Sequence, residues 1–379
     1  MEWVKLGDIA EITMGQSPDS SYYNENGEGL PFYQGVSDFG EVFPSPSKFS
    51  TKPKKIAQKG DILIGVRAPV GDINISNEDC CIGRGIASIR PNNKKYSRDF
   101  LYFHLLSQNK YLNSQATGST FKAISRSVLE NILVPKITLE VQENIAYTIA
   151  SIRKLIAKRR EQIDDLVALV DSVFYEMFGD PLTESNRAYK AHRLEELVTD
   201  IIGGGTPSKK RSDYYGDAIP WITPKDMKEK YLERGKISIS DEGLENSSAQ
   251  LIPRGSLLMV IRSGILKKYI PLAICTNEVT VNQDMKAFVL KQKINVQYLY
   301  YYIRASERFL LGKVRSVTAD NFNFNDVKNL NITLPPIDLQ NRFADYVTSI
   351  EAQKESLRAS LSELETLFDA LMQEAFSGL

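Results

Sequence analysis

Two long stretches of the chain repeat apolar residues at alternating intervals of four and three. The first extends from Ile145 to Met177, and the second begins 198 positions later and extends from Phe343 to Leu371. Intervals that average 3.5 residues keep apolar side chains on one face of a helix over about five heptads. The pattern predicts two long helices that pair as a coiled coil. The alternative is that each helix is an ordinary amphipathic helix packed on its own domain.

The predicted contact faces of these helices are called the apolar seams. Arg159 and Lys354 are charged residues within them, and each either fixes the register of the helix pair or extends its side chain to water. The apolar members of the seams are Ile145, Ile149, Ile152, Ile156, Ile163, Leu166, Val170, Val173, Met177, Phe343, Val347, Ile350, Leu357, Leu361, Leu364, Phe368 and Leu371.

The segments that precede the two helices resemble each other. The recurring motifs are LGDI at 6–9 and LEEL at 194–197, GQSP at 15–18 and GGTP at 204–207, and GDILIGVR at 60–67 and GSLLMVIR at 255–262. Each copy ends on a short apolar run closed by proline, ILVP at 132–135 and ITLPP at 332–336. The frame is duplicated while the loops differ in length and sequence, as expected where loops carry specificity.

Within each copy, short apolar runs bounded by Gly, Pro, Ser and Asn predict strands, and longer periodic runs predict helices. The predicted strands are 61–66, 85–90, 256–261 and 286–290, and the predicted helices are 98–108 and 296–306. We therefore expect a mixed α+β fold with two tandem globular α/β domains, at 1–137 and 183–336, each followed by a long helix, at 138–182 and 337–379.

Helix geometry predicts how these parts connect. A helix of about 40 residues is about 60 Å long, because each residue adds roughly 1.5 Å. The linker FGDPLTESNRAY spans at most about 40 Å when fully extended, so it cannot lead the chain back to the start of the first helix. We expect the second helix to run back along the first as an antiparallel coiled coil, which gives a pseudo-two-fold dumbbell.

Charge is distributed unevenly along the chain. The totals of 47 basic and 47 acidic residues by themselves argue against a nucleic-acid partner. However, the domains at 1–137 and 183–336 carry 16 basic with 14 acidic and 23 basic with 17 acidic side chains. The helical segments at 138–182 and 337–379 carry 5 with 8 and 3 with 8. The domains therefore suit phosphates better than the helices do, and the acidic helices suit protein partners.

Several catalytic signatures are absent from the sequence. It has no Glu-x-Lys of the metal-dependent nucleases, no P-loop and no Pro-Pro site of the amino-methyltransferases. Of the two histidines, His104 is expected to pack in a core or against a partner, and His192 is expected in solvent. The three cysteines lack disulfide or metal spacing. We predict no catalytic site, no metal site and a cytoplasmic location, since the sequence shows no signal peptide or membrane span.

The order of globule, long helix, globule and long helix resembles the specificity subunit of type I restriction-modification systems. The resemblance covers essentially the whole chain. It is carried by the domain openings WVKLGDIAEITMGQSP and HRLEELVTDIIGGGTP, the strands GDILIGVR and GSLLMVIR, the transitions VPKITLEVQENIA and LPPIDLQNRFA, and the helix exits YEMFGDP and QEAFSGL.

This resemblance implies a DNA-recognition role without chemistry in this chain. In such a family each domain is a target-recognition domain that reads one half of a bipartite, asymmetric site in double-stranded DNA. The helices set the unread gap and dock two modification subunits, through which restriction subunits join. S-adenosylmethionine, ATP and Mg²⁺ would then belong to partner subunits, and this chain would hold no cofactor. Self-association of the chain is a further expectation.

Base edges are read by Arg, Lys, Asn, Gln, Ser and Thr side chains presented from loops. Arg67 and Arg262 are the strongest candidates, because they stand at the exit of the same strand in both copies. The full set of candidate DNA-binding residues is Gln16, Ser17, Gln34, Arg67, Arg84, Ser119, Thr120, Lys122, Ser125, Arg126, Thr206, Ser208, Lys209, Lys210, Lys225, Arg262, Ser263, Lys267, Lys268, Gln283, Arg315, Ser316, Thr318 and Asn323.

Two other classes of function remain open at this stage. A divergent nuclease or methyltransferase would show cleavage or methyl transfer by the purified chain alone. A coiled-coil scaffold with no DNA role would give no reason for varied loops in a preserved frame. For any single candidate residue, a solvated surface side chain is the simpler interpretation. The N-terminal domain has a net charge of only +2, so we expect weak DNA binding without partner subunits.

Overall fold

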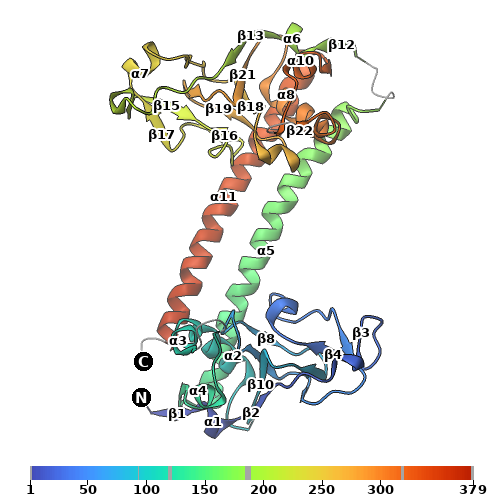
Figure 1. The fold of residues 1–379 in the computed structure, drawn as a ribbon, viewed down its shortest axis with the longest axis vertical. Coiled ribbons are helices and arrows are strands. Elements are labelled where there is room, and N and C mark those ends of the chain that lie inside the picture. The colour runs from blue at the N-terminus through green and yellow to red at the C-terminus, as the bar shows by residue number, and fades with distance from the viewer. Residues whose placement is uncertain (1, 93, 118–121, 184–188, 317–319, 377–379) are drawn as a thin grey trace. The chain divides into compact units, whose positions relative to one another are not determined.

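The protein is described by a computed structural model that covers residues 2–92, 94–117, 122–183, 189–316 and 320–376. The chain divides into two compact units, of which unit 1 is Met1–Glu161 with Arg358–Leu379 and unit 2 is Gln162–Leu357. The two long helices, α5 at Leu139–Phe178 and α11 at Ile337–Phe376, each contribute to both units (Figure 1). Each unit therefore combines a globular domain with part of both helices.

The described part of unit 1 is built on two sheets, one further strand pair and four short α-helices. The antiparallel sheet has the order β2-β10-β7-β8, the second sheet has the order β3-β5-β4-β9-β6, and β1 pairs with β11. The elements are β1 Trp3–Lys5, α1 Leu6–Ile9, β2 Ala10–Met14, β3 Tyr23–Asn24, β4 Leu30–Tyr33, β5 Phe49–Ser50, β6 Ile56–Ala57, β7 Ile62–Gly65, β8 Ile73–Ile75, β9 Cys80–Ile82, β10 Ile86–Pro91, α2 Arg98–Ser107, α3 Asn109–Gln115, α4 Arg126–Glu130 and β11 Leu133–Pro135.

Unit 2 repeats this plan with longer connections. Its first sheet has the order β13-β21-β18-β19-β16, its second has the order β14-β17-β15-β20, and β12 pairs with β24. The elements are β12 Ala191–Arg193, α6 Leu194–Leu197, β13 Val198–Gly203, β14 Tyr215–Gly216, β15 Ile219–Ile222, β16 Tyr231–Leu232, β17 Ile237–Ile239, α7 Asp241–Glu245, β18 Leu257–Val260, β19 Leu272–Cys275, β20 Thr280–Val281, β21 Met285–Leu290, α8 Val296–Ala305, α9 Glu307–Leu311, β22 Arg315–Ser316, β23 Asp320–Asn321, α10 Phe324–Lys328 and β24 Asn331–Thr333.

The expected fold class, mixed α+β with two globular domains and two long helices, is confirmed. The motif GDILIGVR supplies β7 and GSLLMVIR supplies β18, and both strands lie in the middle of their sheets with every residue buried. Within each unit the helices also meet as the antiparallel prediction requires. The end of α11 belongs to unit 1, and the end of α5 belongs to unit 2.

A buried glutamine ties each long helix to its own domain. The Gln142 Oε1 accepts from the Ser97 N–H over 2.9 Å, and its Nε2 donates to the Ile137 carbonyl over 2.9 Å. In unit 2 the Gln340 Oε1 accepts from the Asn295 N–H over 2.8 Å. Both glutamine side chains are fully buried, and the Oε1 of each accepts from the residue that caps α2 or α8, so each helix start is fixed to its domain.

The helix ends are packed into the domain cores. In unit 2, Phe174 and Phe178 of α5 lie against Phe343 of α11 and Tyr298 of α8, with ring centroids 4.8 to 5.9 Å apart. In unit 1, Phe376 of α11 takes part in the core around α2. Because these rings are almost fully buried, the hydrophobic effect anchors the helices to the domains. Within the described residues, no helix combines the length and apolar character that a membrane crossing requires.

Candidate nucleic-acid interface

Three loops of unit 1 meet at the tight turn 83–85 between β9 and β10. The Arg84 N–H donates to the Ser17 Oγ over 3.3 Å, which joins the turn to the loop after β2. The Gly85 N–H donates to the Gln34 carbonyl over 3.0 Å, which joins the turn to the loop after β4. Side chains from distant parts of the sequence are therefore held at one edge of the two sheets.

Arg67 extends this edge at the exit of β7. The Val66 N–H donates to the Gly85 carbonyl over 2.8 Å, and the Ala68 N–H donates to the Lys122 carbonyl over 3.0 Å. The resulting group is called the first polar cluster and consists of Gln16, Ser17, Gln34, Arg67, Arg84 and Lys122, of which Ser17 is partly exposed and the others are exposed. Six of the predicted residues thus lie together.

Glycine at the end of β2 and β13 is required by close backbone contact. A Cβ atom on Gly15 would lie 2.1 Å from the Gly83 carbonyl oxygen, and one on Gly204 would lie 1.8 Å from the Asn282 carbonyl oxygen. Both distances are far shorter than any normal contact, so no larger residue fits. The recurring GQSP and GGTP motifs therefore mark the place where this strand end passes against the turn.

Two further candidates of unit 1 lie at the start of α4. Ser125 is the residue before that helix, and its side chain makes no capping hydrogen bond. The Arg126 Nε donates to the Glu130 carboxylate over 2.7 Å, an exposed pair four residues apart. Ser119 and Thr120 lie outside the described residues.

In unit 2 the turn 282–284, between β20 and β21, corresponds to the turn 83–85 of unit 1 and has equivalent neighbours. The Thr206 Oγ1 donates to the Gln283 Oε1, so the loop after β13 again joins this turn. The Ile261 N–H donates to the Asp284 carbonyl over 2.9 Å, which brings Arg262 beside the turn as Val66 brings Arg67. Thr206, Arg262, Gln283 and Asp284 are called the second polar cluster.

The arginines of the two clusters differ in their partners. The Arg262 Nε and Nη2 each lie 2.6 Å from the Asp284 Oδ1. At the corresponding position unit 1 has Gly85, and the described residues offer Arg67 no ion-pair partner. Asp284 was not among the predicted residues, although it directly follows the predicted Gln283 in the sequence.

The remaining candidates of unit 2 are spread over several loops. Ser208, Lys209, Lys210, Lys225, Lys267 and Lys268 are exposed. Ser263 accepts from the Ile265 N–H at the start of a short helical turn, and Asn323 accepts from the Asn325 N–H at the start of α10, so both side chains serve as caps. Arg315 and Ser316 form β22, and Thr318 lies outside the described residues.

The histidines occupy structural positions. His104 is fully buried, its Nε2 lies 2.8 Å from the Leu133 carbonyl, and burial lowers the pKa of its imidazole to about 4. The His192 Nδ1 lies 3.3 Å from the Glu196 carboxylate, and 22 % of its side chain is exposed, less than expected from the sequence. Among the described residues, no group of three His, Cys, Asp or Glu side chains could hold a metal ion.

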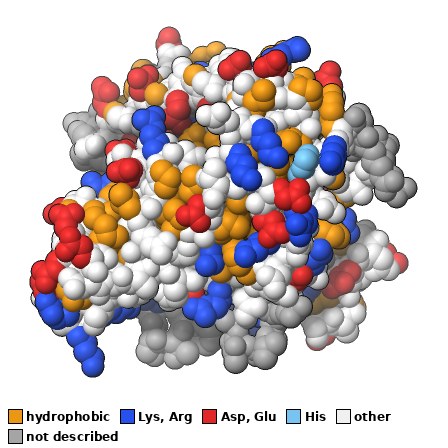
Figure 2. Space-filling view, turned by 90° about the horizontal axis from the view of Figure 1, so that it is seen from above, with side chains coloured by type: hydrophobic (Ala, Val, Ile, Leu, Met, Phe, Trp, Pro, Cys, Tyr) orange, Lys and Arg blue, Asp and Glu red, His pale blue; other side chains and the backbone are white. Residues whose placement is uncertain are grey.

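Charges of both signs are mixed on one face of the molecule. Figure 2 shows a face on which Lys and Arg side chains alternate with Asp and Glu side chains instead of forming one basic patch. This distribution agrees with the zero net charge of the chain. Non-specific attraction to phosphates grows with the number of cations that face them, so a mixed surface supplies little of it.

The seam residues lie on the shielded faces of the helices. Ile149, Ile152, Ile156, Val170 and the first three α11 members, Phe343, Val347 and Ile350, are buried, and the other members are partly buried. Lys354 lies 2.5 Å from Glu351, one turn earlier, and only 13 % of its side chain is exposed. Arg159 is also partly buried.

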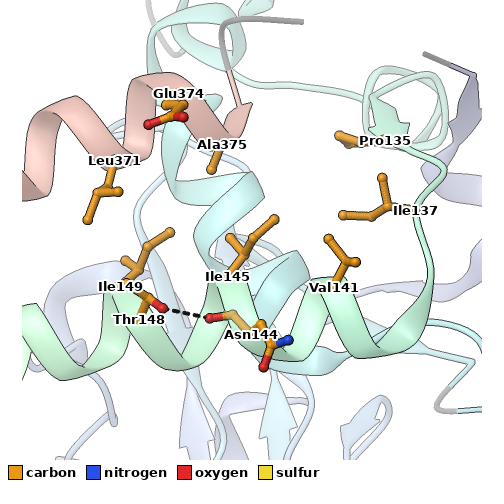
Figure 3. Close-up of a pocket in the computed structure, with 10 residues that line it drawn as sticks. All are labelled: Pro135, Ile137, Val141, Asn144, Ile145, Thr148, Ile149, Leu371, Glu374 and Ala375. Carbon is orange, nitrogen blue, oxygen red and sulfur yellow. Dashed lines mark hydrogen bonds between the residues drawn. The ribbon is translucent and has the colours of Figure 1, made fainter.

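An apolar groove of about 410 Å³ lies in unit 1 between the start of α5 and the end of α11 (Figure 3). Ile145, Ile149 and Leu371 are seam residues that line it, and the Thr148 Oγ1 bonds to the Asn144 carbonyl at its edge. The positions corresponding to Ile145 and Ala375 in unit 2 are Phe343 and Met177, which are larger. Smaller side chains at the same places therefore leave the groove in unit 1.

Comparison with known proteins identifies one family. The family model described as "Type I restriction modification DNA specificity domain" matches residues 1–165 and 186–366. The putative type I restriction enzyme MjaX specificity subunit of Methanocaldococcus jannaschii is 44 % identical over 170 residues, which are 44 % of this chain and 37 % of that protein. The chain thus spans well under half the length of this relative.

Two further similarities extend over nearly the whole chain. The type I restriction enzyme MjaVIII specificity subunit of M. jannaschii is 22 % identical over 399 residues, covering 100 % of this chain and 92 % of that protein. The crystal structure of the type I restriction-modification S subunit from M. genitalium has a TM-score of 0.63 at 14 % identity and covers 99 % of this chain and 96 % of its own. The fold is therefore shared along the full length.

Proposed function

Because this chain belongs to the type I restriction-modification DNA specificity family, we propose that it is the DNA-recognition subunit of such a complex. Each globular domain reads one half of a bipartite, asymmetric site in double-stranded DNA. The chain itself performs no chemistry, and S-adenosylmethionine, ATP and Mg²⁺ are used by partner subunits.

One observation carries this proposal. In both units the same three elements, the end of the first long strand, the turn before the last long strand and the exit of the central strand, bring polar side chains together. The backbone frame is the same in the two clusters, but the side chains differ. Unit 1 has Arg84 and Gly85 at the positions where unit 2 has Gln283 and Asp284. Two readers with different side chains on one frame suit two different half-sites.

The long helices supply the spacing and the docking surface in this proposal. A continuous helix of 40 residues is about 60 Å long, a length that suits a spacer between two recognition domains. The outer faces of α5 and α11 expose Tyr147, Leu155, Tyr346 and Leu367, and these apolar side chains suit contacts with modification subunits. The proposed domain limits are 1–137, 138–182, 183–336 and 337–379.

The test is methylation by the reconstituted complex. The chain is combined with its cognate modification subunits, the complex methylates genomic DNA, and sequencing locates the modified bases, with the modification subunits alone as control. We expect a split motif with two fixed halves around a constant gap. Replacing residues 183–336 with the same domain of a relative should change one half only. Methylation that is absent, or that does not depend on this chain, overturns the proposal.

A further inference from the structure

Asp284 fixes the guanidinium of Arg262 in one orientation. Its Oδ1 is shared by the Arg262 Nε and Nη2, both at 2.6 Å. Its Oδ2 accepts from the Asn282 Nδ2 over 3.1 Å, and its own N–H donates to the Asn282 Oδ1 over 3.2 Å. Asn282 is buried, so the carboxylate rests on a rigid support and both of its oxygens are used.

The backbone around this pair is fixed as well. The N–H groups of Ile261 and Arg262 both donate to the Asp284 carbonyl, over 2.9 and 3.2 Å. On the other side of this strand exit, the backbone of Arg262 forms an isolated antiparallel β-bridge with Asn321. The Phe322 N–H also donates to the Ile261 carbonyl over 2.9 Å. The backbone of Arg262 is therefore held by hydrogen bonds, and its guanidinium is held by the Asp284 carboxylate, although half of the side chain is exposed to solvent.

Within the part of the chain that the structure describes, this arrangement leaves one edge of the guanidinium available. A guanidinium has five N–H donors, and the carboxylate engages only the edge formed by Nε and Nη2. The opposite edge, formed by Nη1 and the second N–H of Nη2, has the fork geometry that matches the O6 and N7 acceptors of guanine in the major groove. A phosphate contact would not require such an orientation, because phosphates present acceptors in many directions.

We propose that Asp284 is a specificity-determining positioning residue, which aims the free edge of Arg262 at a guanine in the half-site that the second domain reads. The inference rests on the proposed function and deepens it for one base pair. Unit 1 has no counterpart of this device, since Gly85 stands at the position of Asp284.

The test uses the reconstituted complex and a library of DNA sites in which each base pair of both halves is varied. In the Asp284→Asn variant, discrimination for guanine at one position of the second half-site should fall by roughly 5- to 150-fold, the range of one good bidentate contact. Arg262→Ala should lose discrimination at the same position, and the double variant should lose no more than Arg262→Ala alone.

Two controls keep the outcome interpretable. Glu196→Gln removes one carboxylate from another exposed arginine pair of unit 2, in which the Arg193 Nε lies 3.0 Å from Glu196, and should leave all positions unchanged. Recognition of the first half-site should persist in every variant, which shows that the complex is folded and active.

The inference is overturned if Asp284→Asn behaves as Glu196→Gln does, or if it weakens binding equally for all sequences, as a phosphate contact would. If the wild-type complex selects no split motif, the proposed function itself is contradicted. If the wild-type complex selects a split motif and Asp284→Asn leaves that motif unchanged, only the inference about Asp284 is contradicted.

Discussion

The two polar clusters share a backbone frame and differ in how their arginines are held. Arg67 stands at the exit of β7 without an ion-pair partner among the described residues, whereas Arg262, at the exit of β18, is bound by Asp284. The difference comes from one position in the adjacent turn, Gly85 in one copy and Asp284 in the other. A preserved frame therefore holds one arginine on a carboxylate and leaves the other without one among the described residues, which under the proposed function would change what each arginine selects.

The joints between helices and domains differ in a similar way. In unit 2 the joint is filled by aromatic rings that include Phe174, Phe178 and Phe343. In unit 1 the corresponding residues include Met372 and Ile145, and the apolar groove remains open. The joint of unit 1 keeps Phe376 as the counterpart of Phe178, but it lacks the two rings that Phe174 and Phe343 supply in unit 2.

The largest expected effect is a loss of stability at the joint between helices and domain in unit 2. Phe174→Ala removes a fully buried ring and should lower the free energy of unfolding of unit 2 by about 3–5 kcal/mol. Met372→Ala, at the matching position of unit 1, should cost less, because Met372 is only partly buried. Urea denaturation of the full chain measures both. Equal losses would show that the joints are equivalent after all.

The second prediction concerns acid stability, which should differ between the units. Burial lowers the pKa of His104 to about 4, so the folded chain binds fewer protons than the unfolded chain between pH 4 and 6.5. The stability of unit 1 should therefore fall as the pH drops through this window, by up to about 3 kcal/mol. The matching residue of unit 2 is Tyr302, whose hydroxyl donates to the Asn331 carbonyl over 3.0 Å.

His104→Tyr should therefore remove the acid sensitivity of unit 1 and keep a hydrogen bond to the Leu133 carbonyl. Denaturation curves at pH 4.5 and 7 can follow Trp3 fluorescence in a Trp221→Phe background, because these two are the only tryptophans of the chain. A variant that loses as much stability in acid as the wild type would assign the effect to other groups.

The third prediction separates the two readers. Arg67→Ala in the reconstituted complex should reduce discrimination in the first half-site only, by about 1–3 kcal/mol, and Arg262→Ala should do so in the second half-site only. The same library of varied sites measures both, and each variant is the control of the other. If a variant weakens binding to target DNA and to scrambled DNA by the same factor, its arginine contacts phosphates and does not read a base.

The smallest expected effect lies between the helices in unit 1. The Arg160 Nη2 lies 2.7 Å from the Glu365 carboxylate, and both side chains are about half exposed. Arg160→Ala should change stability by less than about 1 kcal/mol, and the effect should disappear at high salt. In unit 2 the Lys230 Nζ lies 3.6 Å from Glu351, and this pair is largely buried. Lys230→Ala should lower the free energy of unfolding by more than Arg160→Ala does. A larger loss for Arg160→Ala would contradict this prediction.

The sequence predicted the elements because their patterns are local. The central strands of both units, the helices after them and the two long helices all follow from apolar periodicity. The repeat also predicts that Arg67 and Arg262 are equivalent candidates, whereas Gln34 and Arg84 follow only from their residue types in predicted loops.

The pairs of side chains could not be predicted in the same way. Arg262 and Asp284 are far apart in sequence, and only the pairing of β18 with β21 and the tight turn before β21 place one beside the other. The buried Gln142 and Gln340 lie in the quoted transition motifs, but a glutamine near a helix start is usually solvated. Their role depends on the backbone of a different loop, which periodicity does not describe.

The turn after β9 also limits how the two domains can evolve. A Cβ atom at Gly85 would lie 2.5 Å from the Gln34 carbonyl oxygen, so an acidic residue at this position would require the backbone of unit 1 to be remodelled. The reverse change, Asp284→Gly, removes atoms and meets no such barrier. At this position an acidic partner for the arginine can therefore be lost and regained by single mutations in unit 2, whereas unit 1 could acquire one here only if the loop itself changed.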